Sequence, residues 1–321
     1  MDIFFYEAFA EETRALKSFL PEHIRAGFTE NTLQENHDMH PPAAFISTRT
    51  QSVIPSSWEG LLSGILTRST GFDHIERFLS VCSKRVPAGY LPLYCSRAVA
   101  EQAMLLWMGL LRKLPQQIRN FSAFNRDGLT GSQCTGKVLL AAGVGNIGIE
   151  ICRIAGSLGM RVLGVDIVHR YEEIDYIPIE EGLKRADIIV CSMNLTEDNS
   201  GYFNYGLLKK AKPGAVFVNI ARGELSPTKD LLRLLEEGHL SGIGLDVFEK
   251  ESELAPQLRA GGVGPDQDII TATLELGRRS NVILTPHNAF NTHEALEKKA
   301  GQSIEQILHF LQTGTFLWPV P

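Results

Sequence analysis

The sequence predicts an α/β protein with two doubly wound parallel sheets, each covered by helices. Three observations favour this class. Short apolar runs alternate with helical patterns in the first hundred residues, and the alternation begins again at Lys137. The stretch 120–136 between the two series is polar and contains glycine, so it indicates a loop. Spaced glycines from Gly143 to Gly148 then join a predicted strand directly to a predicted helix.

The first series contains short apolar runs typical of buried strands and two segments with acidic starts and helical spacing. We assign the strands to 3–6, 44–47 and 64–67, and the helices to 11–20 and 73–83. The proline-containing segment 87–92 ends this pattern. A long helix is expected over 98–114, and its apolar stripe indicates core packing rather than a ligand site. That stripe consists of Met104, Leu105, Trp107, Met108 and Leu111.

The second series repeats the alternation with more elements. We assign strands to 137–142, 161–166, 187–192, 215–220, 242–247 and 282–284. The helices between them are assigned to 147–158, 180–185, 206–211 and 229–237, and a last helix to 294–312. Segment 255–276 contains the glycine run 261–265, which predicts a surface insertion.

The composition excludes several functional classes. The 31 Lys and Arg residues are outnumbered by 37 Asp and Glu residues, so the basic footprint of a nucleic-acid-binding protein is missing. The 5 cysteines are odd in number and form no Cys-x-x-Cys pair, which argues against a disulfide framework or a zinc site. The N-terminus lacks a signal-peptide pattern, and no run approaches the roughly 18 apolar residues of a membrane span. We therefore expect a cytoplasmic protein with no metal, nucleic-acid partner or membrane attachment.

The glycines at Gly143, Gly145 and Gly148 form a Gly-x-Gly-x-x-Gly run between a predicted strand and a predicted helix. This context favours a Rossmann-like dinucleotide site, in which the backbone approaches a pyrophosphate at the helix N-terminus. Asp166 ends the next strand, 166 − 148 = 18 positions after the third glycine, close to the roughly 20 expected for the acid that binds the ribose hydroxyls. Its charge favours NAD over NADP, although Arg170 nearby opposes that preference.

Three later strands are followed by charged or titratable residues, Arg222, Glu251 and His287. Each alone is compatible with a structural role, as a surface ion pair, a solvated acid or a turn histidine. The carboxyl ends of parallel strands line the ligand crevice of an open sheet, so the three side chains can converge there. Together they supply a carboxylate clamp, a proton donor or acceptor, and an acid to orient it, as a redox reaction on a hydroxy acid requires.

Four motifs in this order resemble the signatures of the D-isomer-specific 2-hydroxyacid dehydrogenases. They are Gly143-Val-Gly-Asn-Ile-Gly, Asn219-Ile-Ala-Arg-Gly-Glu-Leu, Gly244-Leu-Asp-Val-Phe-Glu-Lys-Glu and Leu284-Thr-Pro-His-Asn-Ala-Phe. Tyr94 and the run ending at Phe290 are most similar to the D-lactate dehydrogenase-like branch. The resemblance implies a discontinuous substrate domain, 1–97 plus 288–321, a NAD-binding Rossmann domain, 98–287, and a homodimer.

The resemblance also implies a role for each matching residue. Arg222 would hold the substrate carboxylate and carbonyl, and His287 would act as acid and base with Glu251 as its partner. The substrate would also meet the N–H groups of Thr70 and Gly71, with Tyr94 lining its pocket, although Tyr94 and Phe290 could equally be core aromatics. The cofactor would be bound by Gly143, Gly145, Asn146, Ile147, Gly148, Asp166, Met193, Asn199, Ala221 and Asp246, with Asp246 at the nicotinamide amide.

Some residues depart from the family pattern. Arg97 stands where Asn is usual, Gln102 where His is frequent, and Asn194 where Pro is usual. Arg97 could favour an acidic substrate or pair with Glu101. Alternatives within the superfamily are a glyoxylate/hydroxypyruvate reductase, a phosphoglycerate enzyme and a formate enzyme, the last disfavoured by Glu251. An alternative of another class is a dinucleotide-sensing scaffold similar to the C-terminal-binding-protein corepressors.

Overall fold

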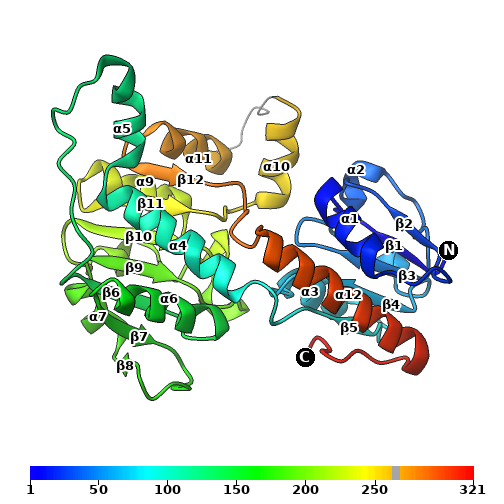
Figure 1. The fold of residues 1–321 in the computed structure, drawn as a ribbon. Coiled ribbons are helices and arrows are strands. Elements are labelled where there is room, and N and C mark those ends of the chain that lie inside the picture. The colour runs from blue at the N-terminus through cyan, green and yellow to red at the C-terminus, as the bar shows by residue number, and fades with distance from the viewer. Residues whose placement is uncertain (262–267) are drawn as a thin grey trace. The chain divides into compact units, whose positions relative to one another are not determined.

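The computed structural model describes residues 1–261 and 268–321. The chain divides into two compact units, which are unit 1, Met1–Cys95 with Asn291–Pro321, and unit 2, Ser96–Phe290. Each unit is built around its own sheet, and α12 (His293–Thr313) is the C-terminal helix that returns to unit 1 (Figure 1).

Unit 1 contains a parallel sheet with the strand order β2-β1-β3-β4-β5. These strands are β1 (Ile3–Phe5), β2 (Ala26–Phe28), β3 (Phe45–Thr48), β4 (Gly64–Thr67) and β5 (Ala88–Gly89). The helices are α1 (Ala10–Phe19), α2 (Leu33–Asn36), α3 (Asp73–Val81) and α12, and α1 packs against α12. Every residue of β3 and β4 is buried, as expected for strands covered on both faces.

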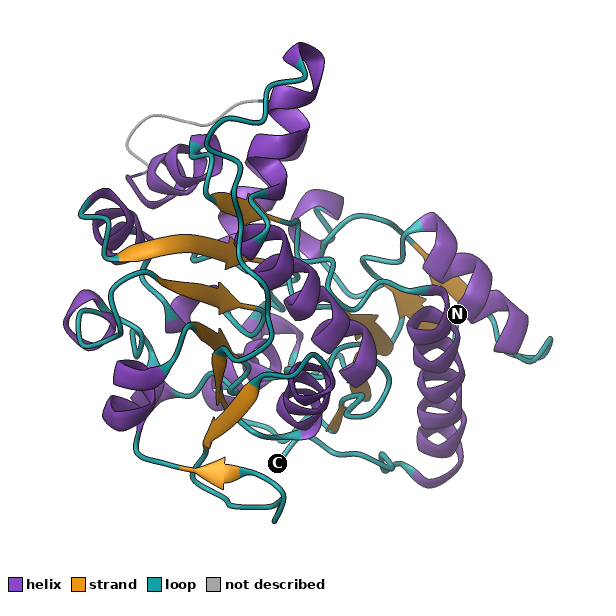
Figure 2. Cartoon of the chain, turned by 60° about the vertical axis from the view of Figure 1, so that its left-hand side comes forward, coloured by secondary structure: helices purple, strands orange, loops and turns teal. Residues whose placement is uncertain are grey.

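Unit 2 contains a larger parallel sheet with the order β12-β11-β10-β9-β6-β7-β8 (Figure 1). Figure 2 shows strands of this sheet with helices on either side. The strands are β6 (Val138–Ala142), β7 (Arg161–Val165), β8 (Asp175–Tyr176), β9 (Ile188–Cys191), β10 (Ala215–Asn219), β11 (Leu240–Leu245) and β12 (Val282–Leu284). The helices are α4 (Ser96–Leu111), α5 (Leu114–Asn120), α6 (Asn146–Ser157), α7 (Ile179–Arg185), α8 (Tyr205–Leu208), α9 (Thr228–Glu236), α10 (Glu251–Arg259) and α11 (Asp268–Arg278).

The chain order reverses at β6, because β7 lies on one side of it and β9 on the other. Ligands of open α/β sheets bind outside the carboxyl ends of the strands at such a switch point. The glycine run predicted to bind a dinucleotide follows β6 directly. The topology therefore places that run where a cofactor is expected.

The structure corrects two expectations in unit 2. Segment 255–276 is not a surface insertion, because it contains most of α10 and α11, and α11 packs against α9 and β12 with Ile270 and Leu276 buried. Residues 262–265 of its glycine run lie outside the described residues. Leu105, assigned to the core stripe of α4, is 53% exposed, whereas Trp107 on the same helix is fully buried.

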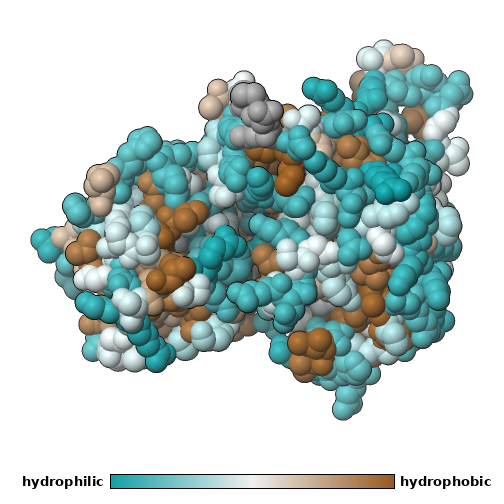
Figure 3. All heavy atoms as spheres, turned by 180° about the vertical axis from the view of Figure 1, so that it is seen from behind, coloured by the Kyte–Doolittle hydropathy of each residue, from teal (hydrophilic) through white to brown (hydrophobic). Residues whose placement is uncertain are grey.

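Separate hydrophobic patches lie among hydrophilic residues on the face shown in Figure 3. After α4, the short α5 segment and the turn that follows it expose Ile118, Phe121 and Phe124 by 69%, 75% and 79%. No helix in the described ranges is long and apolar enough to cross a membrane. The same ranges contain no group of His, Cys, Asp and Glu side chains that could hold a metal ion.

Candidate active site

The ends of three neighbouring strands carry the predicted catalytic residues. Asn219 at the end of β10 pairs with Leu245 at the end of β11, which pairs with Leu284 at the end of β12. The chain then continues from these aligned ends to Arg222, Glu251 and His287 respectively. The register thus brings the three predicted residues to one edge of the sheet.

The turn that carries Arg222 is held by Asn219, a fully buried residue whose role the sequence analysis missed. The Asn219 side chain accepts a hydrogen bond from the Ala221 N–H at 3.0 Å and donates to the Arg222 carbonyl at 2.8 Å. Its amide also donates to the Ser226 hydroxyl at 2.8 Å. A strand-terminal Asn before a turn is the signal that could have identified it, because Asn side chains favour such local bonds.

Gly223 allows the Arg222 turn to pack against the chain that follows β11. A Cβ atom on this residue would lie 1.8 Å from the Phe248 carbonyl carbon and 2.2 Å from the Glu249 nitrogen. Since both atoms belong to the backbone, no side-chain movement could relieve that overlap. The close approach ties the Arg222 turn to the segment that leads into Glu251.

His287 and Glu251 form a hydrogen-bonded pair, with 2.6 Å between Nδ1 and Oε1. Their side chains are 19% and 17% exposed, so both are shielded but reachable from solvent. His287 has a φ of 48°, and Lys250, directly before Glu251, has a φ of 52°. Left-handed conformations are rare for residues other than glycine and cluster at functional sites. The contact with Glu251 uses Nδ1 of the ring, so Nε2 is the other ring nitrogen that can exchange a proton.

Asp246 holds the turn that carries His287. Its fully buried carboxylate accepts hydrogen bonds from the Thr285 hydroxyl at 2.5 Å, the Asn288 N–H at 3.0 Å and the Ala289 N–H at 2.9 Å. Burial raises the pKa of Asp246, and these donors together with the His287 ring oppose that rise. The sequence analysis did not foresee this task, and the predicted nicotinamide contact stays a prediction.

The glycine run after β6 is shaped by two close backbone approaches. Gly143 has a φ of 92°, and a Cβ atom there would lie 2.6 Å from the Met193 backbone nitrogen. A Cβ atom on Gly148 would lie 2.0 Å from the Gly143 carbonyl oxygen. A side chain at either position would therefore displace the loop.

The same run leaves room where a phosphate would lie. Apart from Gly145 itself and its two chain neighbours, no atom lies within 4 Å of the position of a Cβ atom on Gly145. Helix α6 begins at Asn146, so the N–H groups of Asn146 and Ile147 belong to its first turn and have no helical acceptor. These features fit a dinucleotide pyrophosphate.

Asp166 follows β7 and lies beside the glycine run. Its carboxylate accepts the Val144 N–H at 2.6 Å and the Val168 N–H at 3.0 Å. An acid fixed in this way at the end of the second strand fits the ribose of a dinucleotide. Arg170, considered as an opposing charge, is exposed.

Met193 and Asn199 belong to the loop that follows β9. The Asn199 side chain accepts the Thr196 N–H at 2.8 Å and donates to the Asn194 carbonyl at 2.8 Å, which closes the loop on itself. Met193 approaches the glycine run, as the Gly143 distance shows. The predicted adenosine contacts of both residues stay predictions.

In unit 1, Thr70 and Gly71 follow β4 and Tyr94 follows β5, so all three lie at the carboxyl edge of that sheet. The Thr70 hydroxyl donates to the Leu91 carbonyl at 3.1 Å. Tyr94 is 7% exposed, and burial raises the pKa of its phenol well above the usual value. Phe290, at the end of unit 2, is 8% exposed. Both aromatic side chains are thus buried.

Two departures from the family pattern have visible partners. The exposed Arg97 guanidinium lies 2.7 Å from Glu101 and 3.5 Å from Glu150. Of its two interpretations, the structure shows the pairing with Glu101. The Gln102 amide donates to the Thr285 hydroxyl at 3.3 Å, which adds a further support to the turn before His287.

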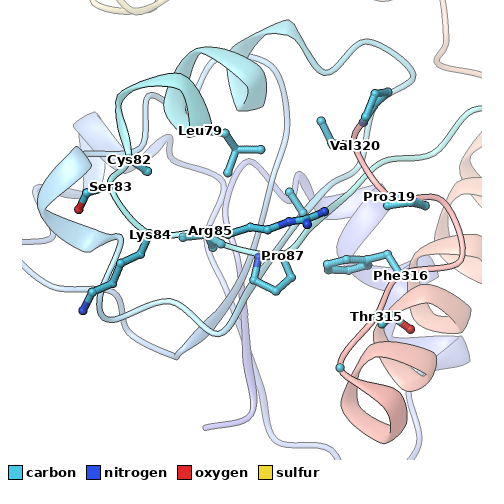
Figure 4. A pocket seen from close by; sticks show the side chains of 14 residues that line it. Leu79, Cys82, Ser83, Lys84, Arg85, Pro87, Thr315, Phe316, Pro319 and Val320 are labelled. Carbon is cyan, nitrogen blue, oxygen red and sulfur yellow. The ribbon is translucent and has the colours of Figure 1, made fainter.

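A cavity of about 680 Å³ lies elsewhere in unit 1, lined by Leu79, residues 82–88, residues 314–316 and residues 319–321. Leu79, Pro87, Phe316 and Val320 surround it in Figure 4. Strand β5 begins at Ala88, so the cavity lies at the amino end of that strand and contains none of the predicted site residues. It is not part of the candidate active site.

The comparison with known families decides the class of the protein. The family described as D-isomer specific 2-hydroxyacid dehydrogenase, NAD binding domain, matches residues 103–289. The chain belongs to this family. It is therefore an NAD-dependent D-2-hydroxyacid dehydrogenase of the D-lactate dehydrogenase-like branch, and the resemblance and cofactor inferred from the sequence are confirmed.

Its relatives agree with this membership. A D-lactate dehydrogenase of Streptococcus agalactiae is 29% identical over 85% of this chain and 83% of its own length. The enzyme of the same name from Streptococcus pyogenes is 31% identical over 70% of this chain and 69% of its own. The solved D-lactate dehydrogenase of Aquifex aeolicus, complexed with NAD and lactic acid, superimposes with a TM-score of 0.85. It is 26% identical and covers 98% of this chain and 99% of its own.

Proposed function

We propose that Arg222, His287 and Glu251 carry out the interconversion of a 2-oxo acid and a D-2-hydroxy acid in this dehydrogenase. The observation that supports these roles most is the 2.6 Å contact between His287 and Glu251, on the same sheet edge as the Arg222 turn. A histidine oriented by a carboxylate is the arrangement that general acid–base catalysis requires.

In the reduction direction, the planar Arg222 guanidinium binds the substrate carboxylate and the carbonyl oxygen together. It stabilises the negative charge that develops on that oxygen, and protonated His287 donates a proton to it. Glu251 keeps the ring oriented and stabilises its positive charge until the transfer. In the oxidation direction, neutral His287 accepts the hydroxyl proton.

NAD fits the residues after β6, β7 and β9. The open backbone at Gly145 and the first N–H groups of α6 would hold its pyrophosphate, and Asp166 its ribose hydroxyls. Met193, Asn199, Ala221 and Asp246 are proposed as further contacts. When bound, the nicotinamide supplies or accepts the hydride.

Thr70, Gly71 and Tyr94 are proposed as the substrate contacts that unit 1 contributes. Two of the relatives reported above are named D-lactate dehydrogenases of bacteria, so pyruvate is the first 2-oxo acid to test.

We also propose a cytoplasmic homodimer. The exposed Ile118, Phe121 and Phe124 support it, because apolar groups of this size on one short segment are typical of a surface covered by a partner chain.

NADH oxidation at 340 nm with a panel of 2-oxo acids tests the proposal. The panel contains pyruvate, glyoxylate, hydroxypyruvate, phenylpyruvate, 2-oxoisocaproate and oxaloacetate, and chiral chromatography identifies the product. We expect turnover of at least one acid and a D-2-hydroxy product. Tight NADH binding without turnover would support the dinucleotide-sensing scaffold instead, and an L-product would refute the assignment.

A further inference from the structure

Three side chains at the end of β4 form a continuous chain of hydrogen bonds. The Thr67 hydroxyl lies 2.7 Å from the Ser69 hydroxyl and 3.0 Å from Nε2 of His74, which belongs to the first turn of α3. The Ser69 hydroxyl then donates to the Gly71 carbonyl at 2.6 Å. Thr67 and Ser69 are both buried. The chain therefore connects α3 to the backbone of the loop 68–72 that precedes it.

The direction of every bond in this chain follows from the number of protons available. A carbonyl oxygen can only accept, so the single hydroxyl proton of Ser69 is committed to Gly71. Thr67 must then donate its own proton to Ser69, and its oxygen is left to accept from His74. His74 consequently carries a proton on Nε2. The donors thus follow one order, which starts at the imidazole ring and ends at the loop backbone.

The same loop is anchored on its other side by the segment after β5. The Ser69 carbonyl accepts the Leu91 N–H at 3.1 Å, and the Thr70 hydroxyl donates to the Leu91 carbonyl at 3.1 Å. The Ser69 carbonyl and the Thr70 N–H belong to one planar trans peptide group and point in opposite directions. The bond with Leu91 therefore sets the direction of the Thr70 N–H.

The Gly71 end of the loop depends on the Ser69 hydroxyl. Gly71 has no side chain to restrict its backbone, and the bond from Ser69 to its carbonyl closes the turn over 69–71. Among the residues that the structure describes, no acceptor is found for the N–H groups of Thr70 and Gly71, and both residues are only partly buried. These two donors are the ones proposed above as contacts of the substrate.

We propose that Ser69, supported by Thr67 and His74, positions the loop 68–72 so that its two open N–H groups are held ready for the substrate carboxylate. This inference rests on the proposed function, because it assumes that the loop contacts the 2-oxo acid. Donors that are fixed before binding lose less conformational freedom when the ligand arrives. The three side chains are then positioning residues, which contact the loop and act on the affinity for the 2-oxo acid.

The test measures KM and kcat with NADH in excess, for the 2-oxo acid of the panel that is turned over best. Ser69→Ala should raise KM by about three- to tenfold, the size of one neutral hydrogen bond, and leave kcat and NADH affinity unchanged. Binding of oxamate, an unreactive analogue of pyruvate, to the protein with NADH should weaken by the same factor. Ser80→Ala removes an exposed serine hydroxyl from α3 and is the matched control, which should change none of these values.

Substitutions of Thr67 separate the chain of hydrogen bonds from simple packing. Thr67→Val keeps the shape of the side chain and removes the hydroxyl, so it should raise KM as Ser69→Ala does, and it serves if Ser69→Ala does not fold. Thr67→Ser keeps the hydroxyl and should keep the KM of the unaltered protein. The double variant should show the effect of the larger single variant rather than the product of both, because the two hydroxyls act in series.

The direction of the chain can be measured on the unaltered protein. Nitrogen–proton correlation NMR shows which imidazole nitrogen carries the proton, and the signal of His74 is the one that His74→Gln removes. We expect a proton on Nε2. A neutral ring that is protonated on Nδ1 alone would overturn the direction assigned here.

Two kinetic results would overturn the inference and leave the proposed function intact. One is an unchanged KM in active, folded Ser69→Ala protein. The other is an equal rise of KM in Thr67→Ser and Thr67→Val, which would show that the methyl group of Thr67 matters and its hydroxyl does not. If protein that binds NADH turns over no 2-oxo acid, the proposed function fails and the inference fails with it.

Discussion

The contact between Glu251 and His287 predicts how catalysis responds when the carboxylate loses its charge. Glu251→Gln removes the charge of the carboxylate and keeps most of its shape. In the proposed mechanism His287 donates a proton during reduction and accepts one during oxidation, and Glu251 orients the ring for both transfers. A neutral amide makes a weaker hydrogen bond to the ring than a carboxylate does, so we expect kcat/KM to fall in both directions.

The geometry sets the size of this loss. The pair is 2.6 Å apart, with side chains 19% and 17% exposed, so it is partly shielded from water. A hydrogen bond to a charged group contributes about 1.5–3 kcal/mol, and about 1.4 kcal/mol corresponds to a tenfold change in rate. We therefore expect kcat/KM to fall by about 10- to 100-fold in both directions, with little change in NADH affinity.

Steady-state kcat/KM measured in both directions checks this prediction. Glu253→Gln is the matched control, because Glu253 lies on the same helix with a half-exposed side chain and pairs only loosely with Lys250 at 3.9 Å. Its kcat/KM values should match those of the unaltered protein. If the values of Glu251→Gln match them as well, Glu251 does not support the histidine and the proposed pairing is refuted. His287→Ala should abolish most activity in both directions and leave NADH binding intact.

Three further substitutions test other parts of the site. Arg222→Lys should lower kcat/KM for every 2-oxo acid by a factor of about 10²–10³ with little change in NADH affinity, because an ammonium cannot bind two oxygens as a planar guanidinium does. Unchanged turnover by the folded variant would show that Arg222 does not bind the substrate. Asp166→Ser should weaken NADH binding and improve NADPH binding, measured by titration; an unaltered protein that already prefers NADPH would show that Arg170 prevails. Gly148→Ala places a Cβ atom 2.0 Å from the Gly143 carbonyl oxygen and should weaken NADH binding by about tenfold or more. Gly156→Ala, on the same helix, is the matched control. Its Cβ atom has open space around it, so NADH binding should not change.

Local signals predicted most of the fold. The glycine run needs a strand before it and a helix after it, and the structure places β6 and α6 on either side. Strands β2, β5 and β8 were missed because none of them has a run of large apolar residues like that of β1 or β12, which are also short. These strands form because they pair with neighbouring strands of the sheet, and a short stretch of sequence does not reveal such pairing.

The error over 255–276 has a different cause. The glycine residues in the first half of the segment indicated a loop. This signal hid the helical spacing of Ile270, Thr273 and Leu276, which lie three residues apart. All three are buried in α11, which packs on α9 and β12. Burial of that face depends in part on α9, which begins 268 − 228 = 40 residues before α11, so composition alone misjudged the segment.

The candidate site likewise contains residues that the sequence could predict and residues that it could not. Arg222, Glu251 and His287 could be found because strand ends mark the ligand edge of a parallel sheet. The chain of hydrogen bonds from His74 through Thr67 to Ser69 could not be found, because Ser and Thr occur in many turns and only the folded segment 67–74 brings the three side chains together.

The residues that position the catalytic groups follow from a requirement that the sequence analysis did not apply. Asn219 and Asp246 are fully buried, so their polar atoms must find partners inside the protein. The available partners are the backbone groups of the turns that carry Arg222 and His287. A polar residue at the end of a buried strand therefore selects the conformation of the next turn. The precision of this edge then depends on buried amides and carboxylates as much as on the side chains proposed to meet the substrate.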